Sequence, residues 1–506
     1  MFAKSISSLV FWPVGLVGLL LFVLVLRLAY NVSLHPLRKF PGPKSWAASR
    51  IPWIWSNTHG RLHRDLLALH KKYGSVVRIA PNELSYTTGS SWRTIHGHRP
   101  VEMSKDLRGA GLLPTFKNTD SIVTAPRQDH ARMRRTVAHA FSDKALREQE
   151  DIVQGYIDQL ISRLTDKHTE GPQDLVRWYN YTTFDIMGDL SFGEPFGCLQ
   201  EGQYHEWVSM IFNGVKLYPW IQAAVYYGLT PLRALFAPKK LMEAKEQADR
   251  NAYSKLDRRL ARKDLERKDF MTYILRHNDD RGMSMPEIQE TAVVLIIAGS
   301  ETTATFLSGF TYHTLRNSIV YRRLVREIRT RFARYEDISI LATQDIKYLN
   351  AVIEEAFRIY PPSPSAFPRV VPGQGEKIDG QWVAGNTTVG INQWAANHDP
   401  KNFYRPDDFL PERWMPADLY DSHDVPAEMF AHDDRGVVQP FSFGPRACLG
   451  KNIAYAEMRV IICKLLWSFD LELAANSNND HWADGQETYI LWEKAALWVN
   501  LRPVQR

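Results

Sequence analysis

The sequence is poor in cysteine and shows no linker that would mark a domain boundary within the folded part. Its 506 residues include only three cysteines, Cys198, Cys448 and Cys463, which are too few for a disulfide framework. We therefore expect the folded part to face a reducing compartment. No Ser/Gly-rich linker or low-complexity tract follows about residue 45, and no repeat is visible. These absences exclude disulfide-stapled and repeat proteins, and they favour one large domain.

Two kinds of functional segment are also missing. The net charge is +6 and the pI is about 9.0, but no basic stripe is interleaved with aromatic residues, so we expect no nucleic-acid partner. There is no glycine-rich dinucleotide fingerprint followed by an acidic residue, and no length is left for a flavin domain. The modest basic excess is compatible with a membrane surface, an acidic partner or an ordinary solvated surface.

Charge is absent near the N-terminus. No charged side chain occurs from Ser5 to Leu26, and about 20 apolar residues are enough to span a bilayer as a helix. A cleaved signal would have a shorter apolar core and a small-residue cleavage site. Only Lys4 precedes the run, whereas several basic residues follow it, which places the rest of the chain on the cytoplasmic side. We predict a membrane anchor and connector over residues 1–39 and a folded domain over residues 40–506.

Cys448 lies in a loop with the sequence Phe-Ser-Phe-Gly-Pro-Arg-Ala-Cys-Leu-Gly, residues 441–450. A thiolate binds iron from one side only where the backbone turns sharply around the sulfur, and we expect Gly444 and Gly450 to supply that freedom. Phe441 is placed to shield the sulfur from water. Arg446 is placed to meet an anionic group of a cofactor. The alternative is an inert, buried structural cysteine.

A long helix is predicted in the middle of the chain. Ser284 and Glu287 form a capping-box pattern, and the helix is expected to run to about Asn317. It would be roughly 45–50 Å long, enough to cross a domain. Residues 291–298 are apolar on nearly every face, so this part should be buried.

Polar residues interrupt that apolar helix at positions 299–303. The Thr302 hydroxyl can bond back to the carbonyl of Ala298 and open the helix locally. We expect Gly299 to let the backbone approach a ligand there. Glu301 would be close enough to pass protons inward. Without a cofactor nearby, the same pattern is a Ser/Thr kink with a capped acid.

Charged residues also pair on two other predicted helices. Glu355 and Arg358 lie three apart in a segment of helical periodicity, where they could form an ordinary surface ion pair. His130 and Arg134 lie four apart at the start of a basic helix and share one face. The plain interpretation of that face is a solvated basic surface.

These segments together resemble the cytochrome P450 family. The Cys448 loop resembles its haem-thiolate loop, and residues 298–302 resemble its oxygen-activation motif. The resemblance covers essentially the whole chain, with the motifs in family order. It implies a mainly α fold with small β-sheets, in which a long central helix crosses the domain over a buried haem. Residues 40–506 would form the haem-thiolate catalytic domain.

The resemblance also assigns cofactor-binding residues. Cys448 would be the axial thiolate ligand of haem b (iron protoporphyrin IX). The candidates for holding the haem propionates are His130, Arg134, Arg369 and Arg446. Many relatives have tryptophan at the position of His130, but a histidine still offers a ring N–H.

A structural triad is implied as well. In the family that the sequence resembles, Arg413 would dock on Glu355 and Arg358 to form a buried group that shapes the haem side of the fold. Losing one member would leave an unpaired buried charge and cost roughly 3–5 kcal/mol.

The implied activity is that of a haem-thiolate monooxygenase, with Thr302 and Glu301 handling oxygen and protons. It would hydroxylate or otherwise oxidise a lipophilic small molecule. Residues 298–305 and 393–400 look most like filamentous-fungal members that act on polyketide, terpenoid or alkaloid intermediates. NADPH would supply electrons through a separate diflavin NADPH-cytochrome reductase, with cytochrome b5 as a further donor. Arg132, Arg135 and Lys451 could steer that partner. The protein would lie in the endoplasmic reticulum membrane as a single-pass protein with its catalytic domain in the cytoplasm.

Bulky apolar segments are candidates to line a substrate pocket, although such runs more often form core or membrane-facing surface. The candidates are Leu112, Leu113 and Phe116; the aromatic residues of 207–236; Ala366 and Phe367; and Ile490, Leu491 and Trp492.

Two other functions stay open. One is a haem protein that isomerises a peroxide without external electrons or binds a gas as a sensor; it would not need the proton relay suggested by Thr302 and Glu301. The other is a membrane-tethered binding or scaffold protein in which Cys448 is inert.

Overall fold

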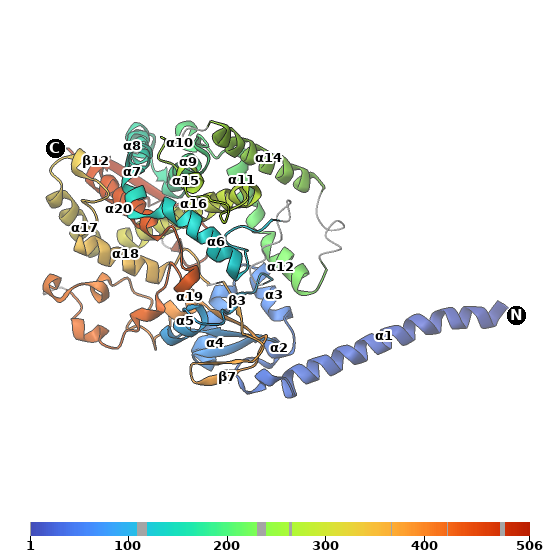
Figure 1. The fold of residues 1–506 in the computed structure, drawn as a ribbon. Helices are drawn as coiled ribbons and strands as arrows, with labels where there is room; N and C mark the ends of the chain where they lie inside the picture. The colour runs from blue at the N-terminus through green and yellow to red at the C-terminus, as the bar shows by residue number, and fades with distance from the viewer. Residues whose placement is uncertain are drawn as a thin grey trace.

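The computed structural model describes residues 2–108, 119–229, 239–262, 266–365, 367–421, 424–475 and 481–505. The fold is mainly α-helical with small sheets (Figure 1). The helices are α1 Phe2–Ser33, α2 Lys44–Ala48, α3 Ile51–Thr58, α4 Leu62–Tyr73, α5 Gly89–His96, α6 Arg127–Ala138, α7 Asp143–Glu148, α8 Glu150–Lys167, α9 Leu175–Phe192, α10 Cys198–Glu201, α11 Glu206–Val215, α12 Tyr218–Tyr226, α14 Lys239–Ala261, α15 Phe270–Arg276, α16 Met285–Arg316, α17 Ser318–Arg331, α18 Lys347–Ile359, α19 Gln393–Asn397 and α20 Lys451–Ser468. The strands are β1 Val76–Ala80, β2 Glu83–Tyr86, β3 Ser104–Lys105, β4 Gln173–Asp174, β5 Arg369–Val370, β6 Glu376–Ile378, β7 Gln381–Val383, β8 Thr388–Ile391, β9 Phe469–Leu473, β10 Glu487–Thr488, β11 Trp492–Glu493 and β12 Trp498–Pro503.

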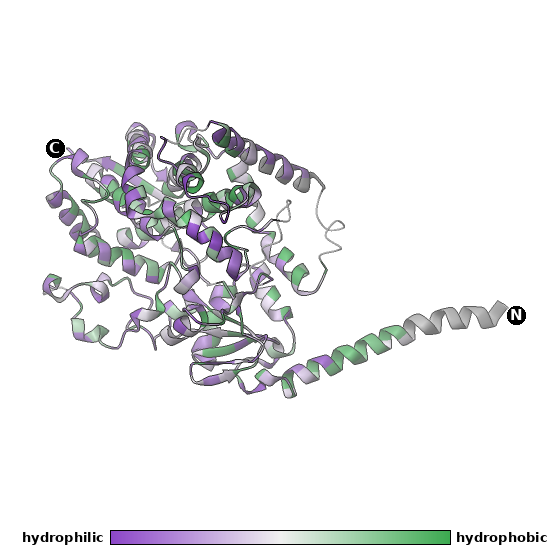
Figure 2. Ribbon diagram, viewed as in Figure 1, coloured by the Kyte–Doolittle hydropathy of each residue, from purple (hydrophilic) through white to green (hydrophobic). Residues whose placement is uncertain are grey.

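Helix α1 leads away from the folded body (Figure 1), and Figure 2 shows its described part as predominantly hydrophobic. The span Gly15–Ser33 contains an 18-residue window with a mean hydropathy of 2.1, and the share of that window buried in the protein is 0%. Near its end, Asn31 is buried and its side chain donates to the Ala48 carbonyl at 2.8 Å. This helix is compatible with a membrane anchor. The predicted connector is partly integral to the body, because Leu37 is 0% exposed.

A five-stranded sheet lies near the base of α1, with the strand order β1-β2-β8-β5-β3. Leu37 and Phe40 join the apolar cluster on this sheet. In the antiparallel pair β3–β5, Lys105 lies opposite Arg369. The sheet register therefore brings together two cations that are far apart in the sequence.

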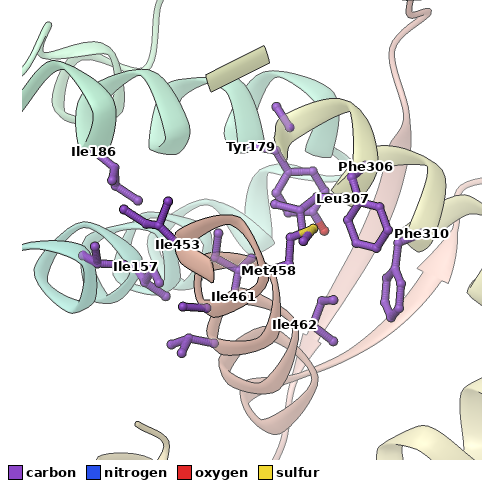
Figure 3. Packing of buried hydrophobic residues seen from close by; sticks show 14 of the residues in the cluster. Ile157, Tyr179, Ile186, Phe306, Leu307, Phe310, Ile453, Met458, Ile461 and Ile462 are labelled. Atoms are coloured by element: carbon purple, nitrogen blue, oxygen red, sulfur yellow. The ribbon is translucent and has the colours of Figure 1, made fainter. Parts of the chain in front are cut away.

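The main core surrounds α20, which packs against α8, α9 and α16 (Figure 3). Residues 460–466 of this helix are all buried, so every side of that part is covered, and Ile453 and Met458 are at most 6% exposed. A helix that is apolar on every side must be enclosed by other elements. This packing holds the segment that follows Cys448 rigidly beneath the central helix.

Helix α16 is the predicted long central helix, and its predicted limits are confirmed. Ser284 is the N-cap residue, and its backbone N–H donates to Glu287 Oε2 at 2.7 Å while Glu287 N–H donates to Ser284 Oγ at 3.5 Å. The reciprocal bonds satisfy two amides that the first turn leaves open. The C-cap residue is Asn317.

Candidate active site

The loop before α20 turns sharply at Gly444. This glycine has a φ of +76°, and a Cβ there would lie 2.0 Å from the carbonyl oxygen of His96. Only glycine fits such a conformation and so close an approach. The Cys448 N–H donates to the Phe441 carbonyl at 2.8 Å, which closes the loop. The predicted turn around the sulfur is present.

Gly450 is expected to supply both backbone freedom and a close approach to the sulfur, and only the backbone freedom is contradicted. Its φ is −78°, which any residue can adopt, and it is the N-cap residue of α20. A Cβ there would lie 3.8 Å from Cys448 Sγ, an ordinary contact. Gly450 therefore contributes small size beside the sulfur and not unusual backbone freedom.

The Cys448 thiol is enclosed by the protein and yet accessible. Burial raises its pKa, while the Gly450 backbone hydrogen bond and the positive charge of Arg134 act in the opposite direction. The residue is nevertheless solvent-exposed, unlike the buried Cys198 and Cys463. The two observations agree if the sulfur faces an internal space. A bound metal would favour the thiolate over the thiol.

Phe441 packs within an aromatic group behind the loop. Its ring centroid lies 5.3 Å from that of Phe357 and 5.1 Å from that of Tyr455. These contacts hold Phe441 in place on one side of the Cys448 loop.

The predicted propionate residues lie together. Arg134 on α6 donates from Nη1 to the Ala447 carbonyl at 2.7 Å. Arg446 pairs with Glu102 and donates to the Ala125 carbonyl at 3.0 Å. Arg369 lies 3.5 Å from the same Glu102. Arg134, Arg369 and Arg446 thus all lie at the Cys448 loop or at the segments beside it.

Burial and like charges depress the pKa values of this group. Burial, then Arg446 and its basic neighbours, lower the pKa of His130 to about 3. Burial and Arg446 lower that of Arg369 to about 10. Burial, then Arg369 and then Arg446 lower the pKa of Lys105 to about 7. Arg369, Arg446 and Lys105 lie close together around the carboxylate of Glu102, and a further anion would stabilise their positive charges.

The sequence analysis missed two members of this basic cluster, Lys105 and His96. Burial, Arg369 and Lys105 lower the pKa of His96 to about 3. Within the described ranges, both ring nitrogens of His96 lack a hydrogen-bond partner, and so does Nε of Arg369. No local motif marks Lys105 or His96, since only the sheet register and the turn at Gly444 bring them here.

Helix α16 carries the predicted hydroxyl. Thr302 Oγ1 donates to the Ala298 carbonyl at 2.6 Å, as predicted. Ala298 is exposed and Thr302 is partly exposed, although they lie in the middle of a core helix. This face of α16 is therefore open.

Gly299 does not face a ligand, contrary to expectation. A Cβ at Gly299 would lie 2.6 Å from Cε of Met187 on α9. The adjacent Ser300 Oγ donates to the Thr183 carbonyl of α9 at 3.1 Å. Gly299 lets α9 pack closely against α16, and Ala298 is the small residue on the open face.

Glu301 points into the protein and not toward the open face. Its side chain is 2% exposed and forms an ion pair with Lys494, whose side chain is 3% exposed. Thr305 Oγ1 donates to Glu301 Oε1 at 3.2 Å, and Lys494 Nζ donates to Thr305 Oγ1 at 2.8 Å. Glu301 Oε2 has no hydrogen-bond partner in the described part of the chain. Sequence analysis gave no indication of Lys494.

The three residues of the predicted triad meet in the core. Glu355 accepts hydrogen bonds from Arg358 Nε at 2.9 Å and Nη2 at 2.7 Å. Arg413 Nε lies 3.0 Å from Glu355 Oε2, and all three side chains are 0% exposed. Arg413 also pairs with Asp433. The pair is therefore buried, and the surface alternative for Glu355 and Arg358 is wrong.

The three basic residues that were predicted to steer a partner have different surroundings. Arg132 contacts Glu287 at 2.7 Å and Asp129 at 3.0 Å, so it ties α6 to the start of α16 and is not free to steer a partner. Arg135 and Lys451 are exposed.

The aromatic run divides between core and surface. Trp207 is 3% exposed and stacks on Phe196, whereas Trp220 is 60% exposed and Tyr227 is 51% exposed. Trp492 is buried and stacks on Tyr360 at 4.8 Å. The candidates Leu112, Leu113, Phe116, Phe236 and Ala366 lie outside the described residues.

The residues present fit a haem. Among the described residues, no group of three or more His, Cys, Asp or Glu side chains could hold a bare metal ion. If the accessible thiol of Cys448 binds a metal, a cofactor would have to supply the other ligands. The basic cluster, with its unpaired donors on His96 and Arg369, fits the two propionates. Ala298 and Thr302 leave one face of α16 accessible.

Comparison with known proteins gives the same family. The cytochrome P450 family model matches residues 41–491. The cytochrome P450 monooxygenase astJ of Aspergillus oryzae is 42% identical over 483 residues, covering 94% of this chain and 94% of that protein. Averantin hydroxylase of Dothistroma septosporum is 42% identical over 490 residues, 96% of this chain and 90% of that protein. Trichothecene C-4 hydroxylase of Trichoderma arundinaceum is 42% identical over 482 residues, 94% of each chain. The chain therefore belongs to the cytochrome P450 family and is a P450 monooxygenase.

Proposed function

We propose that this monooxygenase uses a haem held by Cys448 to hydroxylate, or otherwise oxidise, a lipophilic intermediate of fungal secondary metabolism. The observation that carries the proposal is the enclosed but accessible Cys448 beside a cluster of buried cations. When bound, the haem would supply oxygen activation, because an axial thiolate favours O–O cleavage over reversible oxygen binding.

The chain's own residues would hold that cofactor. Cys448 would donate its thiolate to the iron, and the Gly450 N–H would stabilise the negative sulfur. Arg369, Arg446, His130 and the Lys105 ammonium would bind the propionates. Arg134, which already bonds to the Ala447 carbonyl, would orient the loop from α6.

The residues of α16 would deliver protons to the other side. Thr302 lies on the open face of the helix, and its hydroxyl would hold and pass on a proton at that face. Glu301, the preceding residue, is the nearest acid in sequence and would replenish it. Because the Glu301 carboxylate now contacts Lys494, it must turn from the interior toward Thr302 to do so.

Electrons, location and substrate complete the proposal. NADPH would supply electrons through a separate diflavin reductase, with cytochrome b5 as a further donor. Helix α1 would anchor the protein in the endoplasmic reticulum membrane with its catalytic domain in the cytoplasm. The names of two relatives, averantin hydroxylase and trichothecene C-4 hydroxylase, support hydroxylation as the reaction. A polyketide, terpenoid or alkaloid intermediate as the substrate belongs to the same proposal.

The test is a carbon monoxide difference spectrum of the reduced full-length protein in detergent. We expect the strongly red-shifted Soret band of a thiolate-ligated haem in the wild type and in Cys463→Ala, which removes a buried thiol elsewhere on α20. Cys448→Ala should lose that band. An unaltered band in Cys448→Ala would overturn the ligand assignment.

A second measurement separates the alternative function. With added NADPH and a diflavin reductase, a monooxygenase consumes oxygen. A peroxide isomerase or gas sensor would show the haem spectrum but no NADPH-dependent oxygen uptake, and that result would favour the alternative.

A further inference from the structure

We propose that a cavity between the start of α11 and α14 is a second binding site, which takes a small aromatic carboxylate. The cavity has a volume of about 230 Å³, and α11 contacts α14 beside it (Figure 1). Pockets for drug-sized ligands have volumes of about 300–1,000 Å³, so the ligand here would be smaller. The residues that line the cavity belong neither to the Cys448 loop, nor to the basic cluster, nor to the open face of α16. The proposal therefore does not depend on the haem.

One part of the lining is aromatic. Phe196, which precedes α10, stacks on Trp207 of α11 with ring centroids 5.2 Å apart and an interplanar angle of 12°. Both residues line the cavity, and both are otherwise enclosed by the core, with 6% and 3% of their surfaces exposed. The rings are therefore held in place. A flat apolar group could pack against them and gain from ring stacking as well as from burial.

Helix α14 supplies most of the polar lining. Four of its residues recur at helical spacing on one face and line the cavity: Asn251, Ser254, Lys255 and Arg258. The Lys255 ammonium donates to the Pro195 carbonyl at 3.0 Å and lies 5.1 Å from the ring centroid of Phe196. Because Lys255 is held beside the aromatic ring, its charge lies next to the place where a flat group would bind.

The hydrogen-bonding groups left for a ligand are donors. Asn251 Oδ1 accepts from Gln247 Nε2 at 3.2 Å, which leaves the two N–H donors of the Asn251 amide. His205, which also lines the cavity, accepts at Nδ1 from the Trp207 N–H at 3.2 Å. Its neutral ring therefore carries the proton on Nε2. Ammonium and guanidinium groups only donate, and an ionised carboxylate only accepts, so a carboxylate matches this lining.

Positive charge exceeds negative charge in the lining. Lys255 and Arg258 are its two charged residues at neutral pH, and no carboxylate of the described residues lines the cavity. Outside the lining, Glu194 is shared by Arg258 at 2.6 Å, Lys255 at 3.5 Å and Arg262 at 4.0 Å. Two further acids near His205 also lie outside the lining: Glu201 and Glu206. A bound anion would therefore accept charge-assisted hydrogen bonds from Lys255 and Arg258.

The aromatic and cationic parts together define the ligand class. An inorganic anion would engage the donors but would leave the aromatic rings uncovered. An uncharged aromatic molecule would cover the rings but would give the donors a weaker acceptor. A carboxylate attached directly to an aromatic ring is flat, small and able to use both parts.

The test is a fluorine NMR titration of the full-length holoenzyme in detergent with para-fluorobenzoate, corrected by the same titration of detergent micelles alone. We expect saturable binding without a shift of the Soret band. The uncharged para-fluorobenzamide should bind about 10–100-fold more weakly, the cost of one hydrogen bond to a charged group. Inorganic phosphate should displace para-fluorobenzoate poorly, because it cannot pack on the rings.

Substitutions in the lining locate the site. Arg258→Met and Lys255→Met should each raise the Kd of para-fluorobenzoate about 10–100-fold. Ser254 is exposed, so Ser254→Asp should fold, and it adds a carboxylate that repels the ligand. It decides the question if Lys255→Met does not fold. The matched control is Arg250→Met: Arg250 lies on the same helix, is 59% exposed against 54% for Arg258, and pairs with Glu246 outside the cavity. Its Kd should equal that of the wild type.

Four results would each overturn the proposal. The first is the absence of saturable binding at millimolar concentrations. The second is equal affinity for para-fluorobenzoate and para-fluorobenzamide, or displacement by phosphate at equal concentration, because either would exclude the proposed ligand class. The third is equal affinity of the Arg258→Met and Arg250→Met variants. The fourth is binding that shifts the Soret band and persists in the lining variants, because the probe would then occupy the haem pocket.

Discussion

Replacing Glu355 by glutamine should destabilise the protein severely, although Glu355 is not expected to touch substrate or oxygen. Its carboxylate is 0% exposed and accepts hydrogen bonds from Arg358, the Leu410 N–H at 2.9 Å and Trp414 Nε1 at 2.8 Å. Arg413 Nε lies 3.0 Å away. Glutamine fits the same volume but removes the negative charge that two buried guanidinium groups share.

The magnitude follows from that burial. Breaking a buried ion pair by removing one partner costs about 3–5 kcal/mol, against a typical total stability of about 5–15 kcal/mol. Part of the charge stays compensated, because Arg413 also pairs with Asp433 and Arg358 Nη1 donates to the Asn397 carbonyl at 2.9 Å. We therefore expect about 3 kcal/mol, the lower end of the range.

The sign of the pH dependence is also determined. Burial alone would raise the pKa of Glu355, but Arg358 and Arg413 outweigh it and the pKa is lowered from 4.5. A carboxyl group whose pKa is lower in the folded state than in the unfolded state stabilises the fold when the pH is above its unfolded-state pKa. This stabilisation is lost as the pH falls toward the folded-state pKa. The deficit of Glu355→Gln should therefore be full at neutral pH and shrink below pH 4.5.

The assay is denaturant unfolding of the full-length protein in detergent, followed by far-ultraviolet circular dichroism and by the Soret band. The control is Glu170→Gln, which removes a partner of Lys167 in an exposed pair of the same spacing and should change nothing resolvable. A loss below about 1 kcal/mol in Glu355→Gln would refute the argument, since that is the value of a surface pair.

Two further predictions concern a buried acid and the N-terminal segment. Burial raises the pKa of Glu457 from 4.5 to about 8, so the wild type takes up a proton on folding and loses stability as pH rises between those values. Glu457→Gln should remove this loss, so its free energy of unfolding should rise by about 3–5 kcal/mol relative to that of the wild type between pH 5 and pH 8. If the free energies of unfolding of the two proteins run parallel over that pH range, the assignment is contradicted. Deleting residues 2–33 should release a haem-loaded protein from membranes. Deleting residues 2–39 also removes Leu37, which is 0% exposed, and should cost about 1.5–3 kcal/mol more; equal stability of the two truncated proteins would mean that the connector does not belong to the body.

Local patterns in the sequence determined much of the site. The capping box at Ser284 set the start of α16, because a cap depends on residues three apart. The back-bond from Thr302 to Ala298 follows from helical spacing. The sharp turn at Gly444 follows from a glycine in a short motif. Each of these features depends on neighbours along the chain and can be read without the fold.

The tertiary structure alone decided where side chains point and what they meet across the fold. Gly299 faces Met187 and Glu301 faces Lys494, because packing against α9 and the C-terminal strands sets the rotation of α16 about its axis. Lys105 joins Arg369 through the β3–β5 register. Such contacts bring together residues that are distant in sequence, and their pairing depends on burial and packing that no local pattern contains.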